Sequence, residues 1–339
     1  MFGLAAIAVP ALPAGAASLH CGDTITSDLV LSKNLTCSGT ALVVSVAAGS
    51  TVSIDLNGHR LKGDGTGTGI ETVRPNGNAG TLSVSGGTIT GFATALVGAG
   101  QGSLATLNVT GMRLVSNGGW LPIDLGPQTN VQDSSFIDSG LGGSSENRQW
   151  LIVRNSKFVR SGIHSSYQSF TFVYDSTFVG GGIYAGIESN LVVLRNSFQA
   201  CDVGVSLNTG FSAGTTTVED NTFSKCRIGA VLGGLDGPVS VQRNSFVNST
   251  ETGMMFTSAP GLNGDIAGNT FLHNGGDGLS GSGLTSSTGP LPIIRITGNQ
   301  ANRNGGYGLD LTGVTDGGGN TARGNANPAQ CTGVVCTSH

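Results

Sequence analysis

Charged side chains are scarce in this sequence. Only 11% of its 339 residues are Asp, Glu, Lys or Arg, against ~25% in a typical soluble domain. The formal net charge is −4. Because binding to nucleic acid needs clustered Lys and Arg, this composition argues against a DNA or RNA partner. The chain is nevertheless 38% hydrophobic. It should therefore fold, since disordered chains combine low hydrophobicity with high net charge.

Long uninterrupted apolar runs are also lacking. No stretch beyond the first residues reaches the ~18 apolar residues of a transmembrane helix, so we expect no membrane span. Residues 1–17 are apolar and then small, and Ala14-Gly15-Ala16 fits a signal-peptide cleavage site. The basic start of such a signal is missing, because the first Lys or Arg is Lys33. We interpret 1–17 as a partial secretory signal whose true start lies upstream, and we expect a secreted, extracellular protein.

The chain repeats a short unit in which Asn, then Ser or Thr, precedes Phe. Four copies have this form, and they are Asn196–Phe198, Asn221–Phe223, Asn244–Phe246 and Asn269–Phe271. Earlier copies have one more residue between the Asp or Asn and the Phe, and they end at Phe136, Phe158 and Phe178. Successive Phe residues are 22, 20, 20, 25, 23 and 25 positions apart. Each unit also contains a Gly before an apolar residue, at Gly162, Gly182, Gly204, Gly229, Gly253, Gly278 and Gly308.

The runs between these markers are short and rich in β-branched residues, which favours strands over helices. A period of ~20–25 residues fits a leucine-rich horseshoe or a β-solenoid. The L-x-x-L-x-L-x-x-N pattern of the horseshoe is absent from the sequence. We therefore predict an all-β parallel solenoid of about eleven coils, stacked ~4.8 Å apart.

Stacking of coils explains the residue types that recur. Phe at an inward position forms an internal aromatic stack. Asn at the turn before it forms a ladder of amides and tolerates the left-handed conformation, as Gly does at a second corner. In this scheme Asp133 and Asp175 replace the ladder Asn in two coils.

Six cysteines in a secreted chain invite pairing. Cys201 and Cys226 each follow their Phe by three positions, so both occupy one position of adjacent coils. Cα atoms ~4.8 Å apart are within the ~4.4–6.8 Å range of disulfides, and we predict a bond between them. The remaining four form two close pairs: Cys21 and Cys37 bracket the N-terminal segment, and Cys331 and Cys336 close a small loop.

The recurring unit resembles the right-handed parallel β-helix superfamily, which includes pectate-lyase-like proteins, over about residues 45–325. The segment IDLNGHRLKG (54–63) also looks like the entry coil of secreted bacterial members. The resemblance implies an N-terminal cap at 18–44, stapled by the first cysteine pair, and a C-terminal cap or tail at 326–339. It also implies polysaccharide lyases, hydrolases or epimerases as relatives, together with many members that have no known activity.

The catalytic motifs of that superfamily are missing. The chain has no Asp-Asp pair and no D-P-H motif, and Gly58-His59-Arg60 only partly matches a G-H-G motif. Calcium takes six to eight oxygen ligands, whereas Asp277 and Asp316 are isolated in Gly-rich turns. We interpret His59, Asp277 and Asp316 as turn residues. We expect no metal and no cofactor, and calcium binding has no motif to support it.

Alignment of the coils nevertheless gathers one set of polar residues. Asp138 stacks on Arg160 and His164 on Tyr184, with Glu188 nearby, and these five are the candidate catalytic residues for acid–base chemistry. Four aromatic residues in the same third of the chain are candidates for carbohydrate binding, namely Trp120, Trp150, Tyr167 and Tyr174. The alternative is that all of them are solvent-facing positions of a sheet. A further column, of Arg154, Tyr174, Arg195, Asp220 and Arg243, can either follow an anionic polymer or be a solvated face.

Two functions stay open at this point. The first is a secreted β-helix that binds, and can cleave or epimerise, an extracellular polysaccharide or cell-surface glycan along a lateral face. The second is a non-catalytic scaffold or adhesion module without carbohydrate chemistry. Whether the chain is an enzyme is left undecided, and we expect a monomer.

Overall fold

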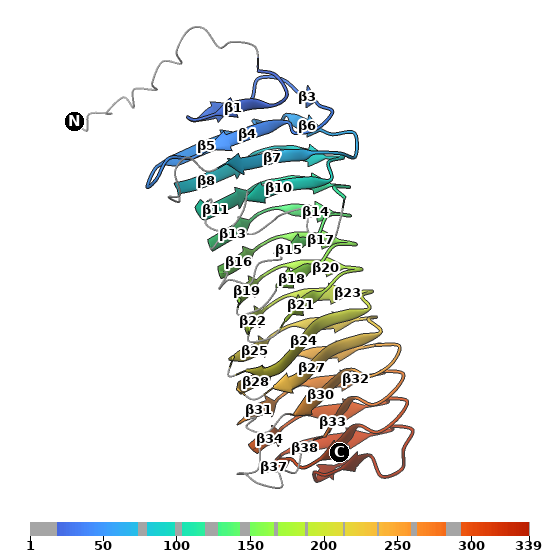
Figure 1. The fold of residues 1–339 in the computed structure, drawn as a ribbon. Helices are drawn as coiled ribbons and strands as arrows, with labels where there is room; N and C mark the ends of the chain where they lie inside the picture. The colour runs from blue at the N-terminus through green and yellow to red at the C-terminus, as the bar shows by residue number, and fades with distance from the viewer. Residues whose placement is uncertain are drawn as a thin grey trace, which may run out of the picture.

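The computed structural model describes residues 19–73, 80–98, 104–118, 128–142, 150–165, 169–186, 189–212, 214–235, 237–258, 263–282 and 293–338. Within these ranges every regular element is a β-strand, and the strands wind into an elongated solenoid (Figure 1). Neighbouring strands pair in parallel, as in β16 with β19, β17 with β20 and β18 with β21. The predicted all-β parallel solenoid is confirmed.

Each coil passes through three faces in a fixed order. The first face is a 13-stranded sheet. Its strands are β2 (Leu29–Val30), β5 (Thr51–Asp55), β8 (Gly80–Ser85), β11 (Leu104–Thr110), β13 (Gln128–Gln132), β16 (Trp150–Arg154), β19 (Phe170–Tyr174), β22 (Asn190–Leu194), β25 (Thr216–Glu219), β28 (Pro238–Gln242), β31 (Asn263–Ala267), β34 (Ile293–Thr297) and β37 (Thr315–Gly318).

The second face is a 14-stranded sheet of mostly three-residue strands. Its strands are β3 (Leu35–Thr36), β6 (Arg60–Lys62), β9 (Thr88–Thr90), β12 (Arg113–Val115), β14 (Ser135–Ile137), β17 (Lys157–Val159), β20 (Thr177–Val179), β23 (Ser197–Gln199), β26 (Thr222–Ser224), β29 (Ser245–Val247), β32 (Thr270–Leu272), β35 (Gln300–Asn302), β38 (Asn320–Arg323) and β40 (Cys336–Thr337).

The third face consists of two sheets, one of four strands and one of nine. The four strands are β1 (Asp23–Ile25), β4 (Leu42–Ser45), β7 (Thr68–Val73) and β10 (Thr94–Gly98). The nine are β15 (Leu141–Gly142), β18 (Ile163–Ser165), β21 (Ile183–Ala185), β24 (Val203–Ser212), β27 (Ile228–Leu235), β30 (Met254–Ser258), β33 (Leu279–Ser282), β36 (Leu309–Thr312) and β39 (Cys331–Thr332). The first strands, β1 to β3, already pair with β4 to β6, and the assignment of 18–44 as a cap stays a prediction.

Alternate side chains of every face point inward and fill one continuous core. Its centre is the predicted stack of phenylalanines, whose seven rings are fully buried. Adjacent rings lie 4.6 to 5.0 Å apart between centroids and within 10° of parallel. Each such pair contributes about 0.5–1.5 kcal/mol beyond its burial. The Gly-apolar pairs also align as predicted, because Ile163, Ile183 and Val205 are register partners on the third face.

The first turn, which joins the first face to the second, contains the predicted amide ladder. The backbone and side-chain nitrogens of Asn196 both donate to Oδ1 of Asn221, at 2.8 and 3.1 Å. The same pair of hydrogen bonds joins each later coil to the next through Asn244, Asn269, Asn299 and Asn320. Because each ladder residue is buried, these bonds satisfy turn amides that water does not reach.

Serine continues this ladder in the earlier coils, and here the sequence prediction was wrong. Ser134 donates its backbone N–H to Oγ of Ser156 at 3.2 Å, so the first turn has constant length and no additional residue. Asp133 and Asp175 do not replace the ladder Asn. They occupy the position before it, with φ of 51° and 50°, where Arg195 has φ of 57°.

A second ladder lies in the second turn, between the second and third faces, and includes a disulfide. Ser139 donates its backbone N–H to Oγ of Ser161 at 3.0 Å, and farther along Asn274 and Asn304 repeat the arrangement. Between them the same position holds Cys201 and Cys226, bonded to each other with Cα atoms 4.3 Å apart. The pairs Cys21–Cys37 and Cys331–Cys336 are also bonded.

The recurring glycines serve close packing and not the left-handed conformation expected of them. A Cβ at Gly204 would lie 2.6 Å from the carbonyl oxygen of Gly229 and 2.6 Å from the ring of Phe223. The left-handed residues of this corner are instead those before the second ladder, such as Asp138 and Arg160, with φ of 49° and 47°.

Arginines bridge neighbouring coils at these left-handed positions. Four consecutive first turns present Asp175, Arg195, Asp220 and Arg243 in one row. Arg195 bonds Asp175 at 2.7 Å, and Arg243 bonds Asp220 at 2.8 Å. The hydrogen bond from the arginine holds the pKa of each aspartate below its ordinary value.

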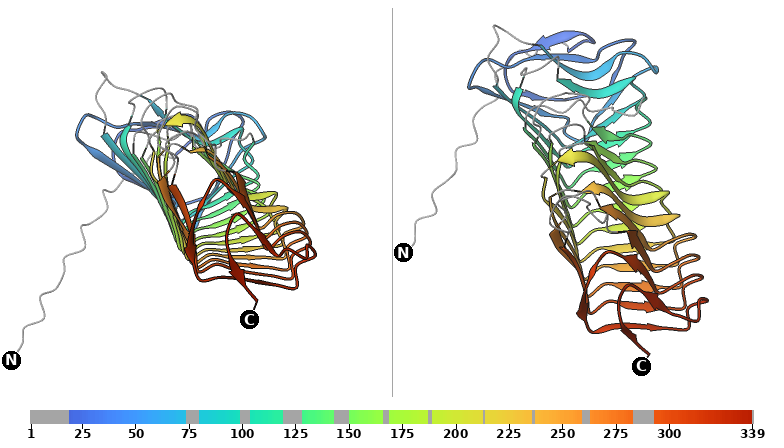
Figure 2. Two further views of the ribbon diagram at one scale, coloured as in Figure 1. Left: turned by 90° about the horizontal axis from the view of Figure 1, so that it is seen from below. Right: turned by 60° about the horizontal axis from the view of Figure 1, so that its bottom comes forward.

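The third turn leads from the third face back to the first. Every internal segment outside the described ranges immediately precedes a strand of the first face. The second turn also changes in length, from three residues between β26 and β27 to six between β29 and β30, whereas the first turn has two residues in every coil from β8 to β35. Figure 2 shows the strands stacked in walls, and Figure 1 shows β1 and β38 near opposite ends of the rod.

Candidate functional site

Two of the predicted catalytic residues form an ion pair on the second turn. Arg160 makes a two-pronged contact with Asp138, with Nε–Oδ1 at 2.7 Å and Nη2–Oδ2 at 2.6 Å. Their side chains are 63% and 40% exposed. The hydrogen bond from Arg160 lowers the pKa of Asp138, and the reciprocal bond raises the pKa of Arg160. The carboxylate is therefore ionised and has both oxygens engaged.

His164 and Tyr184 lie on the third face and stack on adjacent coils, as predicted. They are register partners on β18 and β21, and their side chains point outward. Burial raises the pKa of the half-buried Tyr184 hydroxyl, and the negative charge of Asp202 adds to this shift while Arg227 opposes it. At neutral pH the hydroxyl is thus protonated, so it can donate a proton but not abstract one, and the raised pKa makes it a weaker acid than an exposed tyrosine.

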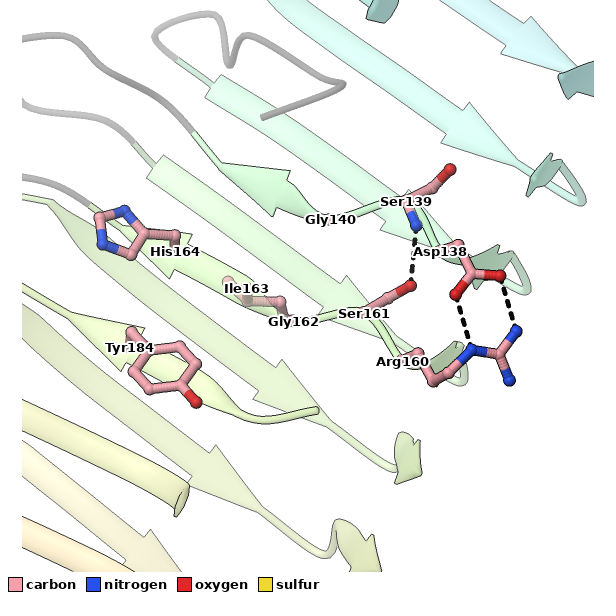
Figure 3. Close-up of a pocket in the computed structure, with 9 residues that line it drawn as sticks. All are labelled: Asp138, Ser139, Gly140, Arg160, Ser161, Gly162, Ile163, His164 and Tyr184. Atoms are coloured by element: carbon pink, nitrogen blue, oxygen red, sulfur yellow. Dashed lines mark hydrogen bonds and ion pairs between the residues drawn. The ribbon is translucent and has the colours of Figure 1, made fainter. Parts of the chain in front are cut away.

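The four residues line one hollow of about 300 Å³ (Figure 3). The ion pair lies at one end, and His164 and Tyr184 lie at the other, on neighbouring strands. Gly140 and Gly162 lie between them. A Cβ at Gly162 would lie 2.7 Å from the carbonyl oxygen of Gly182, so the close packing of coils keeps this stretch free of side chains.

The Asp138–Arg160 pair recurs in the same form at other coils of the rod. Arg195 donates hydrogen bonds from Nε and Nη2 to the carboxylate of Asp175 at 2.7 and 2.8 Å, and Arg227 forms an ion pair with Asp202 at 2.6 Å. A contact repeated along both turns is a feature of coil stacking. We therefore interpret Asp138 and Arg160 as one wall of the hollow, and His164 and Tyr184 as its available acid–base groups.

The two predicted aromatic residues that the structure describes, Trp150 and Tyr174, do not line this hollow. Trp150 and Tyr174 lie on the outer side of the first face, at opposite ends of β16 and β19. Glu188, Trp120 and Tyr167 lie outside the described residues. The described candidates therefore do not converge on one site. Trp150 and Tyr174 lie on the first face, whereas His164 and Tyr184 lie on the third face, across the third turn.

An aromatic platform on the first face was largely missed by sequence reasoning. It consists of Trp150, Phe170, Phe172 and Tyr174. The indole of Trp150 stacks on Phe170, with centroids 4.5 Å apart and planes within 15°, and contacts Phe172 at 5.8 Å. The guanidinium of Arg154 lies over the Tyr174 ring, 5.5 Å from its centroid.

The platform arises from strict alternation along β19. Thr171 and Val173 are buried, whereas Phe170, Phe172 and Tyr174 face outward and are partly exposed. In β16 the same alternation exposes Trp150, whose side chain is 45% accessible. Large apolar residues rarely gather on the outside of a soluble protein without a ligand or partner. The signal available in the sequence was the F-T-F-V-Y run of β19, which carries aromatic residues at every outward position.

The described ranges contain neither a metal-ligand cluster nor a long apolar helix. Three His, Cys, Asp or Glu side chains are nowhere grouped there so as to hold a metal ion. No helix in that part of the chain is long and apolar enough to span a bilayer. The three disulfides indicate an oxidising compartment, extracellular or periplasmic.

Comparison with known proteins identifies a family. A family model described as "right handed beta helix region" matches residues 115–259 and 161–327. No curated protein sequence is significantly similar to the chain.

Three similar solved structures are crystal structures of the periplasmic alginate epimerase AlgG. A double mutant of that enzyme has a TM-score of 0.48 and 13% identity, covering 80% of this chain and 65% of its own. Two other AlgG structures have TM-scores of 0.40 and 0.38, at 11% and 12% identity, each covering 81% of this chain and 77% of its own. The chain thus spans about two thirds of the length of the first of them, at 65%.

Proposed function

The chain belongs to the right-handed β-helix family, whose model matches more than half of its length, and from this premise we propose that it binds an extracellular or periplasmic polysaccharide along its first face. The observation that carries the proposal is the aromatic platform of Trp150, Phe170, Phe172 and Tyr174. The β-sheet beneath holds these rings in place before any ligand arrives, which lowers the entropic cost of binding.

The geometry of the platform suits a sugar chain. Because Trp150 and Phe170 stack face to face, they present ring edges to solvent, and the C–H groups of a pyranose can pack across these edges while its hydroxyls make hydrogen bonds alongside. Trp150 and Phe170 lie on adjacent strands, ~4.8 Å apart. Their mutual stacking makes one broad apolar surface with an exposed edge. A protein partner would also cover apolar surface, and this scaffold function is the alternative that the experiment must separate.

The hollow of His164 and Tyr184 supports a second candidate function, proton transfer on the bound polysaccharide. The observation in its favour is that two adjacent outward residues able to exchange protons line a single cavity. Tyr184 would donate a proton and His164 would accept one, with Asp138 and Arg160 forming the wall. Glu188 is retained as a further candidate for this site, and Trp120 and Tyr167 as candidates for sugar contacts.

Binding is tested on a panel of neutral and uronate-containing polysaccharides by affinity electrophoresis and calorimetry. We expect Trp150→Ala to weaken binding about tenfold or more, since central aromatic contacts contribute about 2 kcal/mol or more. The control is Val335→Ala, which removes an apolar side chain that is 73% exposed near the C-terminus. If no glycan binds, the carbohydrate function is refuted and the scaffold function is favoured. If glycans bind but both variants behave alike, the platform is not the binding surface.

Catalysis is tested in the same reactions by following unsaturated products and reducing ends. His164→Ala should abolish any turnover but leave binding at the platform intact. Unchanged turnover in this variant would remove the hollow from the mechanism.

A further inference from the structure

The first face carries a second feature beyond the platform, a polar hollow over β25, β28 and β31. It has a volume of about 290 Å³. Its outward lining residues are Thr215, Thr217, Pro238, Ser240, Asn263 and Asp265. Hydroxyl, amide and carboxylate groups thus replace the aromatic rings of the platform, and they offer both donors and acceptors.

The hollow and the platform share the same columns of the sheet. Register pairing connects Phe172 to Val192, then to Thr217, Ser240 and Asp265. Only the strand β22 separates the aromatic rungs from the hollow, so the two lie ~10 Å apart along the rod. On β22 the Oδ1 of Asn190 accepts the backbone N–H of Thr215 at 2.9 Å. A single extended ligand can therefore contact both.

Charge in the hollow discriminates between ligands. Of the described residues that line it, Asp265 is the one with a charge. At its rim Glu219 accepts the hydroxyl of Ser240 at 2.8 Å and pairs with Arg243 at 2.8 Å, so that arginine is already engaged. Arg295 occupies the rung after Asp265 but does not line the hollow. A ligand carboxylate would face Asp265, whereas a sugar hydroxyl can donate a charge-assisted hydrogen bond to it.

We propose that the hollow is a second subsite for the same ligand, and that this ligand is a neutral polysaccharide long enough to cover platform and hollow together. The proposal rests on the proposed function. The C–H groups of one sugar pack on the platform, and hydroxyls of sugars farther along the polysaccharide bond to Asp265, Ser240 and Thr217. Affinity for neutral oligosaccharides therefore rises steeply once their length spans β22 and reaches the hollow.

The experiment measures binding by calorimetry for neutral β-linked gluco-oligosaccharides, from disaccharide to octasaccharide, and for oligogalacturonates of matched length. Wild-type protein should prefer the neutral series, with an affinity that is insensitive to salt. Asp265→Asn should weaken binding of the long neutral oligosaccharides about tenfold, because a charge-assisted bond is lost, and leave the short ones unchanged. The same variant should strengthen binding of oligogalacturonates.

Glu251→Gln is the matched control, because it removes one negative charge from an exposed residue paired with Arg227 on the second turn. The proposal is overturned if wild-type protein prefers oligogalacturonates in a salt-sensitive manner that Arg295→Ala abolishes. It is also overturned if Asp265→Asn and Glu251→Gln act alike, or if affinity does not change with length. Those results leave polysaccharide binding in place, whereas the failure of every glycan to bind would remove the proposed function as well.

Discussion

The phenylalanine stack allows the contribution of ring-on-ring contact to be measured separately from burial. Phe198 has a ring on each side, Phe178 at 4.8 Å and Phe223 at 4.7 Å. Phe136 has one ring neighbour, Phe158 at 4.6 Å, and its other register partner is Leu114. Phe198 and Phe136 are both fully buried. Replacement by Leu therefore removes a similar amount of buried apolar surface at either site.

The difference between the two substitutions is one stacked pair. We expect Phe198→Leu to lower the free energy of unfolding by about 0.5–1.5 kcal/mol more than Phe136→Leu. The assay is equilibrium unfolding in urea, followed by far-ultraviolet circular dichroism and tryptophan fluorescence together. The two signals must give one transition for the energies to be comparable, because a solenoid can unfold in parts. Equal losses, or a larger loss at Phe136, would show that stacking adds nothing to burial in this core.

Two further predictions concern the turns. Asn221→Ala should destabilise the protein by more than about 2 kcal/mol, because it leaves the buried backbone N–H of Asn196 without an acceptor and removes the hydrogen bonds that the Asn221 side chain donates. Asn221→Ser should cost less in the same urea assay, since serine holds this position in earlier coils, and equal losses would contradict the ladder's role. Stability should fall below about pH 4: the pKa of Asp175 and Asp220 is lowered in the folded state, so their contribution is present above the ordinary pKa and is lost as pH falls through the lowered value. Between neutral and acidic pH, the urea midpoint should fall less in Asp175→Asn than in the wild type. This difference should shrink in high salt, because the ion pair is exposed. If the midpoints of both proteins fall equally with pH at low salt, the ion pair does not contribute to stability.

Sequence reasoning succeeded where the same residue type occupies the same position in successive coils. Phe198 and Phe223, and Cys201 and Cys226, occupy equivalent positions in successive coils, so counting along the chain was sufficient to pair them. It failed where two residue types fill one position. Ser156 continues the ladder of Asn196, but a pattern built on Asn treats that coil as having an additional residue. The proposed column of Arg154 with Arg195 therefore joined two different positions, because Arg154 aligns with Tyr174 and Leu194.

The candidate site was predicted only in part, because outward residues follow no repeat. The pairing of His164 with Tyr184 followed from the Gly markers and is confirmed. That pairing does not determine which side of the rod a residue faces relative to residues of another sheet. Trp150 was therefore grouped with His164, although the two lie on different faces. Phe170 and Phe172 were overlooked, since an apolar residue in a strand is ordinarily read as core.

The row of charges along the first turn has a consequence for assembly of the rod. In the core, each of these coils stacks a phenylalanine ring on the same ring of the next coil, so the phenylalanine stack alone does not fix which coils are neighbours. Outside, Asp175, Arg195, Asp220 and Arg243 alternate in sign along consecutive coils. Every correctly stacked neighbour is attractive, whereas a chain that skipped one coil would place Asp175 against Asp220 and Arg195 against Arg243. The alternating charges therefore disfavour a shift of the stacking by one coil, which the phenylalanine stack alone would tolerate.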